Sequence, residues 1–113
     1  MTLSEMSTLL KADIRLVHTP NDRQLHTAFS GDMLSDVLAL GQQPDILLTG
    51  LVNPQVIRTA EMLDTACVVF VRGKAPTEAI LTLADSCGVA VLSSEMDLFE
   101  ASGVLFAAGI LPA

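Results

Sequence analysis

Basic residues are few in this sequence. Its 113 residues contain six Lys and Arg against thirteen Asp and Glu, which gives a formal net charge of -7. A negative field of this kind repels phosphate backbones and anionic lipid headgroups. We therefore expect neither nucleic acid nor a membrane surface among the partners of this protein.

Long hydrophobic runs are also missing. No stretch of the sequence approaches the roughly 20 consecutive apolar residues that a membrane-spanning helix needs. The first twelve residues carry Glu5 and Lys11 in place of a signal-peptide pattern. We therefore expect a cytoplasmic protein.

Residues that bind metals or attack substrates are scarce. Cys67 and Cys87 have neither a metal-ligand spacing nor the pattern of a disulfide framework, and both are interpreted as buried structural thiols. His18 and His26 flank a turn and are expected to lie close together in a hairpin-like arrangement, but two histidines fall short of the three or four ligands of a zinc site. We therefore expect no metal site.

Motifs for catalysis or cofactor binding are absent from the sequence. It contains no phosphate-binding P-loop, no Gly-x-Ser-x-Gly nucleophile elbow and no dinucleotide fingerprint. We therefore predict a protein that is not an enzyme and has no cofactor.

Apolar residues are plentiful, at 50% of the chain, and charged residues make up 17%. This composition supports one hydrophobic core, and the length suits one domain over residues 1–113. Periodicity predicts a helix over residues 3–10 capped by Ser4 or Thr2, a strand over 13–18 and a turn over 19–22. A second strand over 25–29 and a helix over 33–40 that stops at Gly41 follow.

The rest of the chain alternates short apolar runs with helical stretches. Runs of this kind without polar alternation are typical of parallel strands covered on both faces. The runs occupy residues 46–48, 67–71 and 89–92, and the helices that follow them occupy residues 55–63, 78–87 and 96–110. We predict a three-layer α/β/α sandwich with a mostly parallel five-stranded sheet, in which the order of the first two strands is left open.

The segment Phe29 to Ala39, Phe-Ser-Gly-Asp-Met-Leu-Ser-Asp-Val-Leu-Ala, resembles the Gly-Asp-small-Leu-Ser-Asp-Val-Leu segment of the DRTGG domain family. Residues 46–50, 69–74 and 84–94 resemble later strand ends of that family. The eponymous Asp-Arg-Thr-Gly-Gly does not occur: Leu51-Val52-Asn53 follows Thr49-Gly50, and Arg72-Gly73 stands where others carry Gly-Gly.

The family occurs as the N-terminal domain of HPr kinase/phosphorylase-like proteins, as inserts in CBS-domain pyrophosphatases, and as stand-alone proteins often labelled serine kinases. This chain is similar to the stand-alone group. The resemblance implies the fold of that domain, a regulatory or interaction role, and self-association. Kinase chemistry in HPr kinase resides in a separate domain.

Ligands of open parallel α/β sheets bind outside the carboxyl ends of the strands, where loops lead into helices. Four loops of this chain are placed there. Their candidate ligand-binding residues are Ser30, Gly31, Asp32, Thr49, Gly50, Asn53, Arg72, Gly73, Lys74, Ser93 and Ser94.

Each loop also has an ordinary structural interpretation. Arg72-Gly73-Lys74 combines two cations with a flexible glycine before a helix, which suits an anionic group, but the cations could instead pair with nearby carboxylates. Thr49-Gly50 suits a ligand or a tight turn. Asp32, Asn53 and the Ser93-Ser94 pair are interpreted first as helix N-caps, with Asp36 solvated.

The last predicted helix is apolar on more than one face, because Leu98, Phe99, Leu105, Phe106 and Ile110 are spread around it. It either lies inside the core or buries its second face against a partner, for which a two-fold homodimer is the commonest form.

These observations favour a non-catalytic regulatory module that binds a small anionic ligand, such as a nucleotide, or a protein partner. A phosphotransfer enzyme and a pure dimerisation adaptor are the alternatives.

Overall fold

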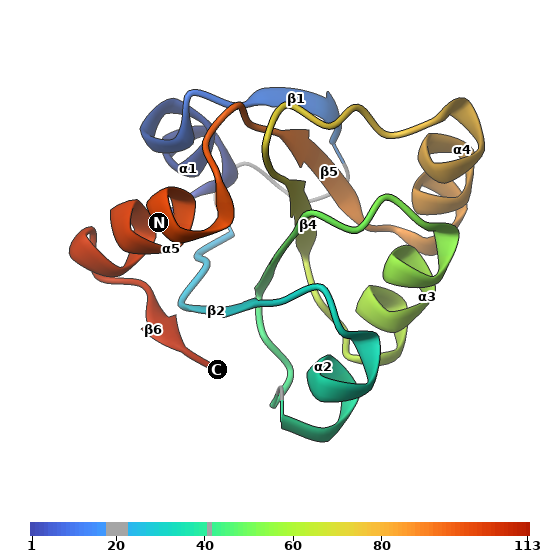
Figure 1. Ribbon diagram of the computed structural model, residues 1–113, viewed down its shortest axis with the longest axis horizontal. Helices are drawn as coiled ribbons and strands as arrows, with labels where there is room; N and C mark the ends of the chain where they lie inside the picture. Colours follow the sequence, from blue (N-terminus) through green and yellow to red (C-terminus); the bar gives the residue numbers. More distant parts are fainter. Residues whose placement is uncertain (18–22, 41) are drawn as a thin grey trace.

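The computed structural model describes residues 1–17, 23–40 and 42–113, which form a sheet covered by helices on both faces (Figure 1). Helices α1 (Leu3–Leu10) and α5 (Leu98–Ala107) cover one face. Helices α2 (Leu34–Leu40), α3 (Pro54–Met62) and α4 (Glu78–Cys87) cover the other. The prediction of a three-layer α/β/α sandwich is confirmed.

The sheet has six strands in the described part of the chain, in the order β1-β5-β4-β3-β2-β6. The strands are β1 (Asp13–Leu16), β2 (Thr27–Ser30), β3 (Ile46–Thr49), β4 (Cys67–Phe70), β5 (Ala90–Ser93) and β6 (Leu111–Pro112). All neighbouring pairs are parallel except β1 with β5.

Two sequence-based expectations about the strands are wrong. The sheet has six strands instead of five, because β6 is only two residues long and contains a proline, which gives no period to detect. The hairpin-like arrangement of the first two strands does not form, because β5, β4 and β3 lie between β1 and β2. His18 lies outside the described residues.

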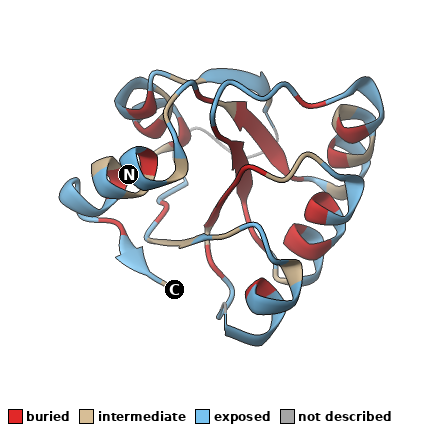
Figure 2. Cartoon of the chain, viewed as in Figure 1, coloured by how far each residue is buried: buried red, intermediate tan, exposed pale blue. Residues whose placement is uncertain are grey.

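Alternate residues of the central strands enter two separate cores. Cys67 and Val69 of β4 pack with α1 and α5, whereas Val68 and Phe70 pack with α2, α3 and α4. Strand β4 is therefore buried over its whole length (Figure 2), which explains why its sequence is continuously apolar.

Local signals set several helix ends. Thr2 and Glu5 form a capping box at α1, and Asn53 accepts a hydrogen bond from the backbone N–H of Gln55 at the start of α3 (2.8 Å). Helix α5 is shorter than the predicted 96–110, because Asp97 caps its start. Its last turn is followed by Gly109 at φ 102°, which directs the chain toward β6.

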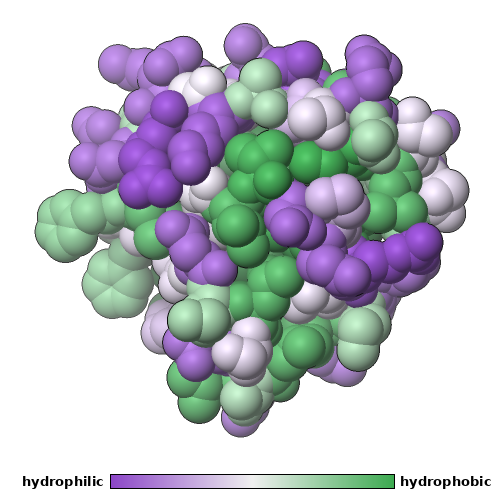
Figure 3. Space-filling model, turned by 45° about the vertical axis from the view of Figure 1, so that its right-hand side comes forward, coloured by the Kyte–Doolittle hydropathy of each residue, from purple (hydrophilic) through white to green (hydrophobic). Residues whose placement is uncertain are grey.

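None of the described helices is long and apolar enough to cross a membrane. The side that carries α3 and α4 is turned forward in Figure 3, where hydrophobic side chains reach the surface between hydrophilic ones. Met62 of α3 is one of the exposed hydrophobic residues, with 70% of its surface accessible.

Candidate functional site

Asp32 joins two of the loops at the carboxyl ends of the parallel strands. Its Oδ1 accepts hydrogen bonds from the hydroxyl of Thr49 (3.0 Å) and from the backbone N–H of Gly50 (2.7 Å). Its Oδ2 lies 3.7 Å from Nη2 of Arg72. The carboxylate is thus engaged by the β3–α3 and β4–α4 loops, and the interpretation of Asp32 as the N-cap of α2 is wrong.

These contacts stabilise the ionised form of Asp32. The hydrogen bond from Gly50 lowers the pKa of the carboxyl group below its ordinary value of 3.8, with further lowering by Thr49, Arg72 and Lys74 against a smaller rise from burial. Asp32 is therefore a carboxylate at neutral pH.

The lowered pKa of Asp32 predicts a pH-dependent part of the stability. A carboxyl group with a depressed folded-state pKa stabilises the fold above pH 3.8, and this contribution is lost as the pH falls through the folded-state value. Because the side chain is half exposed, we expect on the order of 1 kcal/mol. Asp32→Asn should therefore unfold at a lower temperature than the wild type at neutral pH. Thermal unfolding followed down to pH 2 checks this; a difference that stays constant with pH would contradict it.

Arg72 lies across Gly50 in an unusual backbone conformation. Its φ is 59°, and its backbone N–H donates to the carbonyl of Met96 (2.7 Å) in the β5–α5 loop. A Cβ at Gly50 would overlap Nη2 of Arg72, so glycine is required for this close approach.

Lys74 also contacts this loop, since its Nζ donates to the carbonyl of Gly50 (2.9 Å). Both cations of the Arg72-Gly73-Lys74 segment therefore converge on Gly50. Both residues are exposed, so their charges also face solvent. Arg72 pairs with the carboxylate of Asp32, as the structural interpretation of these cations predicted. Both cations nevertheless remain accessible to a ligand.

The β5–α5 loop completes this edge of the sheet. The hydroxyl of Ser93 donates to the carbonyl of Lys74 (2.8 Å), and the backbone N–H of Gly73 donates to the carbonyl of Ser94 (2.8 Å). The carboxylate of Glu95 lies against Gly73, at the position where a side chain would begin. Glu95 was not among the predicted site residues, because an exposed glutamate gives no signal in the sequence.

Ser94 has a structural role in this loop. It is 1% exposed, and its hydroxyl donates to the carbonyl of Leu10 (2.7 Å) and accepts from the backbone N–H of Met96 (3.2 Å). The interpretation of Ser93 and Ser94 as N-caps of the last helix is wrong, because Asp97 holds that position.

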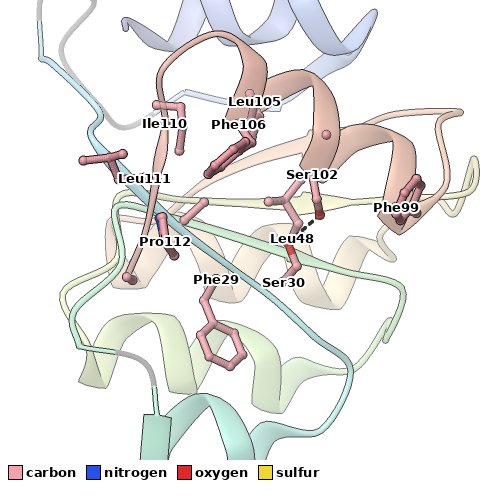
Figure 4. Close-up of a pocket in the computed structure, with 13 residues that line it drawn as sticks. Phe29, Ser30, Leu48, Phe99, Ser102, Leu105, Phe106, Ile110, Leu111 and Pro112 are labelled. Atoms are coloured by element: carbon pink, nitrogen blue, oxygen red, sulfur yellow. Dashed lines mark hydrogen bonds between the residues drawn. The ribbon is translucent and has the colours of Figure 1, made fainter.

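Three further candidates make other contacts. Asn53 caps α3, as predicted, and Gly31 donates its backbone N–H to the carbonyl of Leu48 (3.0 Å). Ser30 points toward α5, where its hydroxyl lies 2.7 Å from that of Ser102 (Figure 4). The structure therefore unites Asp32, Thr49, Gly50, Arg72, Gly73, Lys74 and Ser93 at one edge of the sheet.

A second feature, which the sequence did not locate, is a cavity of about 470 Å³ between α5 and the β2–β6 edge. Its lining includes Phe99, Ser102, Phe106, Leu111 and Pro112 (Figure 4). We refer to this cavity and the exposed side chains around it as the α5 face. The sequence pattern that could have indicated this cavity is the spacing of Phe99, Ser102 and Phe106, which places them along one side of a helix.

No group of three His, Cys, Asp or Glu that could hold a metal ion occurs among the residues that the structure describes. Cys67 is fully buried, and burial raises the pKa of its thiol to about 12, so it is un-ionised at neutral pH. Cys87 is half-buried, so the prediction of a buried thiol is wrong for this residue.

No protein-family model matches the sequence, and no curated protein matches it. Among solved structures, the chain is similar to the CBS and DRTGG domains of the regulatory region of Clostridium perfringens pyrophosphatase, complexed with its activator diadenosine tetraphosphate. The TM-score is 0.77 at 18% sequence identity, and the match covers 92% of this chain and 45% of that chain. This chain thus corresponds to less than half of that one. The similarity shows the fold, which is the α/β fold of a DRTGG domain, so the fold expected from the resemblance is confirmed.

Proposed function

We propose that residues 1–113 act as one regulatory module that binds a small anionic ligand, such as a nucleotide, at the carboxyl edge of its sheet. The observation that carries this proposal is the convergence of Arg72 and Lys74 on Gly50. These residues supply two of the six basic side chains of a chain with a net charge of -7. A phosphate group would be attracted to this pair of cations.

The position of this cluster supports ligand binding. The loops after β3, β4 and β5 meet where ligands of open parallel sheets bind. The backbone bonds that Arg72 and Gly73 make to the β5–α5 loop fix the loop before a ligand arrives. A fixed loop loses little conformational freedom on binding, which favours affinity.

The carboxylate of Asp32 competes with a ligand for Arg72, but only weakly. The separation of 3.7 Å is long for a charge-assisted hydrogen bond, and both side chains are half exposed. Exposed ion pairs of this kind contribute about 0–1 kcal/mol. The guanidinium can therefore turn to a phosphate at little cost.

The similar pyrophosphatase region was crystallised with a dinucleotide activator, and its fold covers nearly all of this chain. This supports a regulatory role and makes nucleotides the first ligands to test.

Thermal unfolding of the protein with a panel of adenine and guanine nucleotides at millimolar concentration tests the proposal. A ligand present at about 100 times its Kd adds about 2.7 kcal/mol, which raises the Tm of a domain of this size by roughly ten degrees. Inorganic phosphate at equal ionic strength is the control for general salt effects. No shift with any nucleotide would overturn the nucleotide proposal.

The two alternatives make different predictions. A pure dimerisation adaptor would leave the Tm unchanged with every ligand. A phosphotransfer enzyme would transfer radiolabelled phosphate from ATP, and Arg72→Ala or Asp32→Ala would abolish the transfer.

A further inference from the structure

The α5 face is an apolar surface on an acidic protein. Phe99 is 89% exposed, Phe106 is 66% exposed and Leu111 is 60% exposed. Exposed aromatic side chains around a cavity are typical of surfaces that bind another protein. From this face we infer that two copies of the chain pair across α5 in an antiparallel, two-fold arrangement, with Phe99 of each copy entering the cavity of the other.

The first argument for a second copy is the absence of charge. None of the residues that line the cavity has a charged side chain, and residues 101–113 contain none. A basic partner would find no side-chain carboxylate to bind on this lining. Two chains of charge -7 can approach each other most easily through a surface without charge.

The second argument is self-complementarity. Phe99 projects at the start of α5, whereas Phe106, Leu111 and Pro112 surround the cavity at its other end (Figure 4). The two phenylalanines are seven residues apart, which is about 10 Å along the helix axis. In a two-fold interface residue i contacts residue j while j contacts i, so antiparallel α5 helices would place each Phe99 opposite the partner's cavity.

The third argument is the glycine at the centre of this surface. Gly103 and Ser102 lie midway between Phe99 and Phe106. A Cβ at Gly103 would meet nothing within 4 Å, so packing inside the monomer does not require glycine there. Glycine in a helix costs stability relative to alanine, by about 1 kcal/mol. At the two-fold axis of a dimer, its missing side chain allows the two helices to approach closely.

The edge of the sheet favours contact through side chains. The backbone N–H groups of Leu111 and Ala113 donate inward to the carbonyls of His26 and Ala28 (both 3.0 Å). Pro112 between them has no N–H to offer a strand from another molecule. Addition of a strand at β6 is therefore disfavoured, so contact at this edge would use the side chains of the α5 face.

Sedimentation velocity of the protein across a wide concentration range tests the pairing. We expect the wild type to have the mass of two chains, and Phe99→Lys or Phe106→Glu to weaken dimerisation by about thirtyfold or more, as for a central interface residue. Met62→Glu on α3 is the matched control at a similarly exposed apolar position, and it should dimerise as the wild type does. A wild type that stays monomeric, or a dimer that only Met62→Glu disrupts, would overturn the inference.

Mixing the two variants tests the antiparallel arrangement. In a mixed dimer, Lys at position 99 of one chain would face Glu at position 106 of the other, while the second contact keeps both phenylalanines. The mixture should therefore dimerise when neither variant does alone. Monomers in the mixture would overturn the antiparallel arrangement.

Gly103→Leu separates folding from pairing. The open space around Gly103 leads us to expect an unchanged or higher Tm of the monomer, measured at low concentration, together with loss of the dimer. A lower Tm with the dimer retained would contradict a role of Gly103 at the axis. These outcomes do not depend on nucleotide binding at the Arg72-Gly73-Lys74 loop.

Discussion

Phe70→Ala should lower the free energy of unfolding by about 3–5 kcal/mol, since it removes a buried aromatic side chain and leaves a cavity. Phe70 is 0% exposed and contributes to the core between the sheet and helices α2, α3 and α4. It also ends β4, immediately before Val71 and Arg72, so the loss of packing reaches the Arg72-Gly73-Lys74 loop. Urea unfolding followed by far-UV circular dichroism measures the change.

Met62→Ala is the control for Phe70→Ala. It also truncates an apolar side chain, but 70% of Met62 is exposed on α3. Its effect should stay within about 0.5 kcal/mol, as for other surface substitutions. Equal effects of the two variants would mean that Phe70 is not a core residue.

Arg72→Ala should weaken binding of an anionic ligand by about ten- to a hundredfold, the worth of one or two charge-assisted hydrogen bonds. The stability of the fold should change little, because the ion pair of Arg72 with Asp32 is half exposed and contributes little. Isothermal titration calorimetry with the nucleotide that gives the largest Tm shift measures the affinity. Arg58→Ala on α3 removes the same charge and a similarly exposed ion pair beside Cys87, at the end of α4 that lies away from the loops, and is the matched control.

Asp32→Asn should have the opposite effect on affinity. It removes a negative charge beside the proposed site while keeping an oxygen that accepts from Gly50. The loss of repulsion at a distance of about 4 Å in a solvated site corresponds to roughly fivefold tighter binding. Weaker binding by Asp32→Asn would show that the carboxylate contacts the ligand, directly or through a cation, and would exclude its role as a competitor.

The parallel part of the fold was predictable because its signals are local. The apolar run Cys67–Phe70 is buried on both faces, so its sequence does not alternate with polar residues. The start of α3 is set by Asn53, which caps the helix, and by Pro54, which suits its first turn. The place of β1 was not predictable. Alternation in residues 13–18 indicates a strand but contains no information about its partner, and the partner proves to be β5.

The candidate site was predictable as a region and not in its contacts. Strand ends of a parallel sheet share one edge, which placed Thr49, Arg72 and Ser93 together. Asp32 met the local rule for an N-cap, but donors from a loop 17 residues further along compete successfully for its carboxylate. The α5 cavity depends on how α5 rests on β2 and β6, so the sequence indicated only that this helix has a second apolar face.

The pairing of β1 with β5 has a consequence for the order in which the protein folds during its synthesis. Asp13 pairs with Ser93, so the first of these six strands to be synthesised binds a strand that is made much later. At roughly 5–20 residues per second, β1 waits about 4–16 s for its partner. Until then β2, β3 and β4 can pair in sequence, while Ile14 and Leu16 of β1 lack their neighbours. We expect the strands at the centre of the sheet to acquire protection from hydrogen exchange before β1 does, in cotranslational folding as well as in refolding of the complete chain.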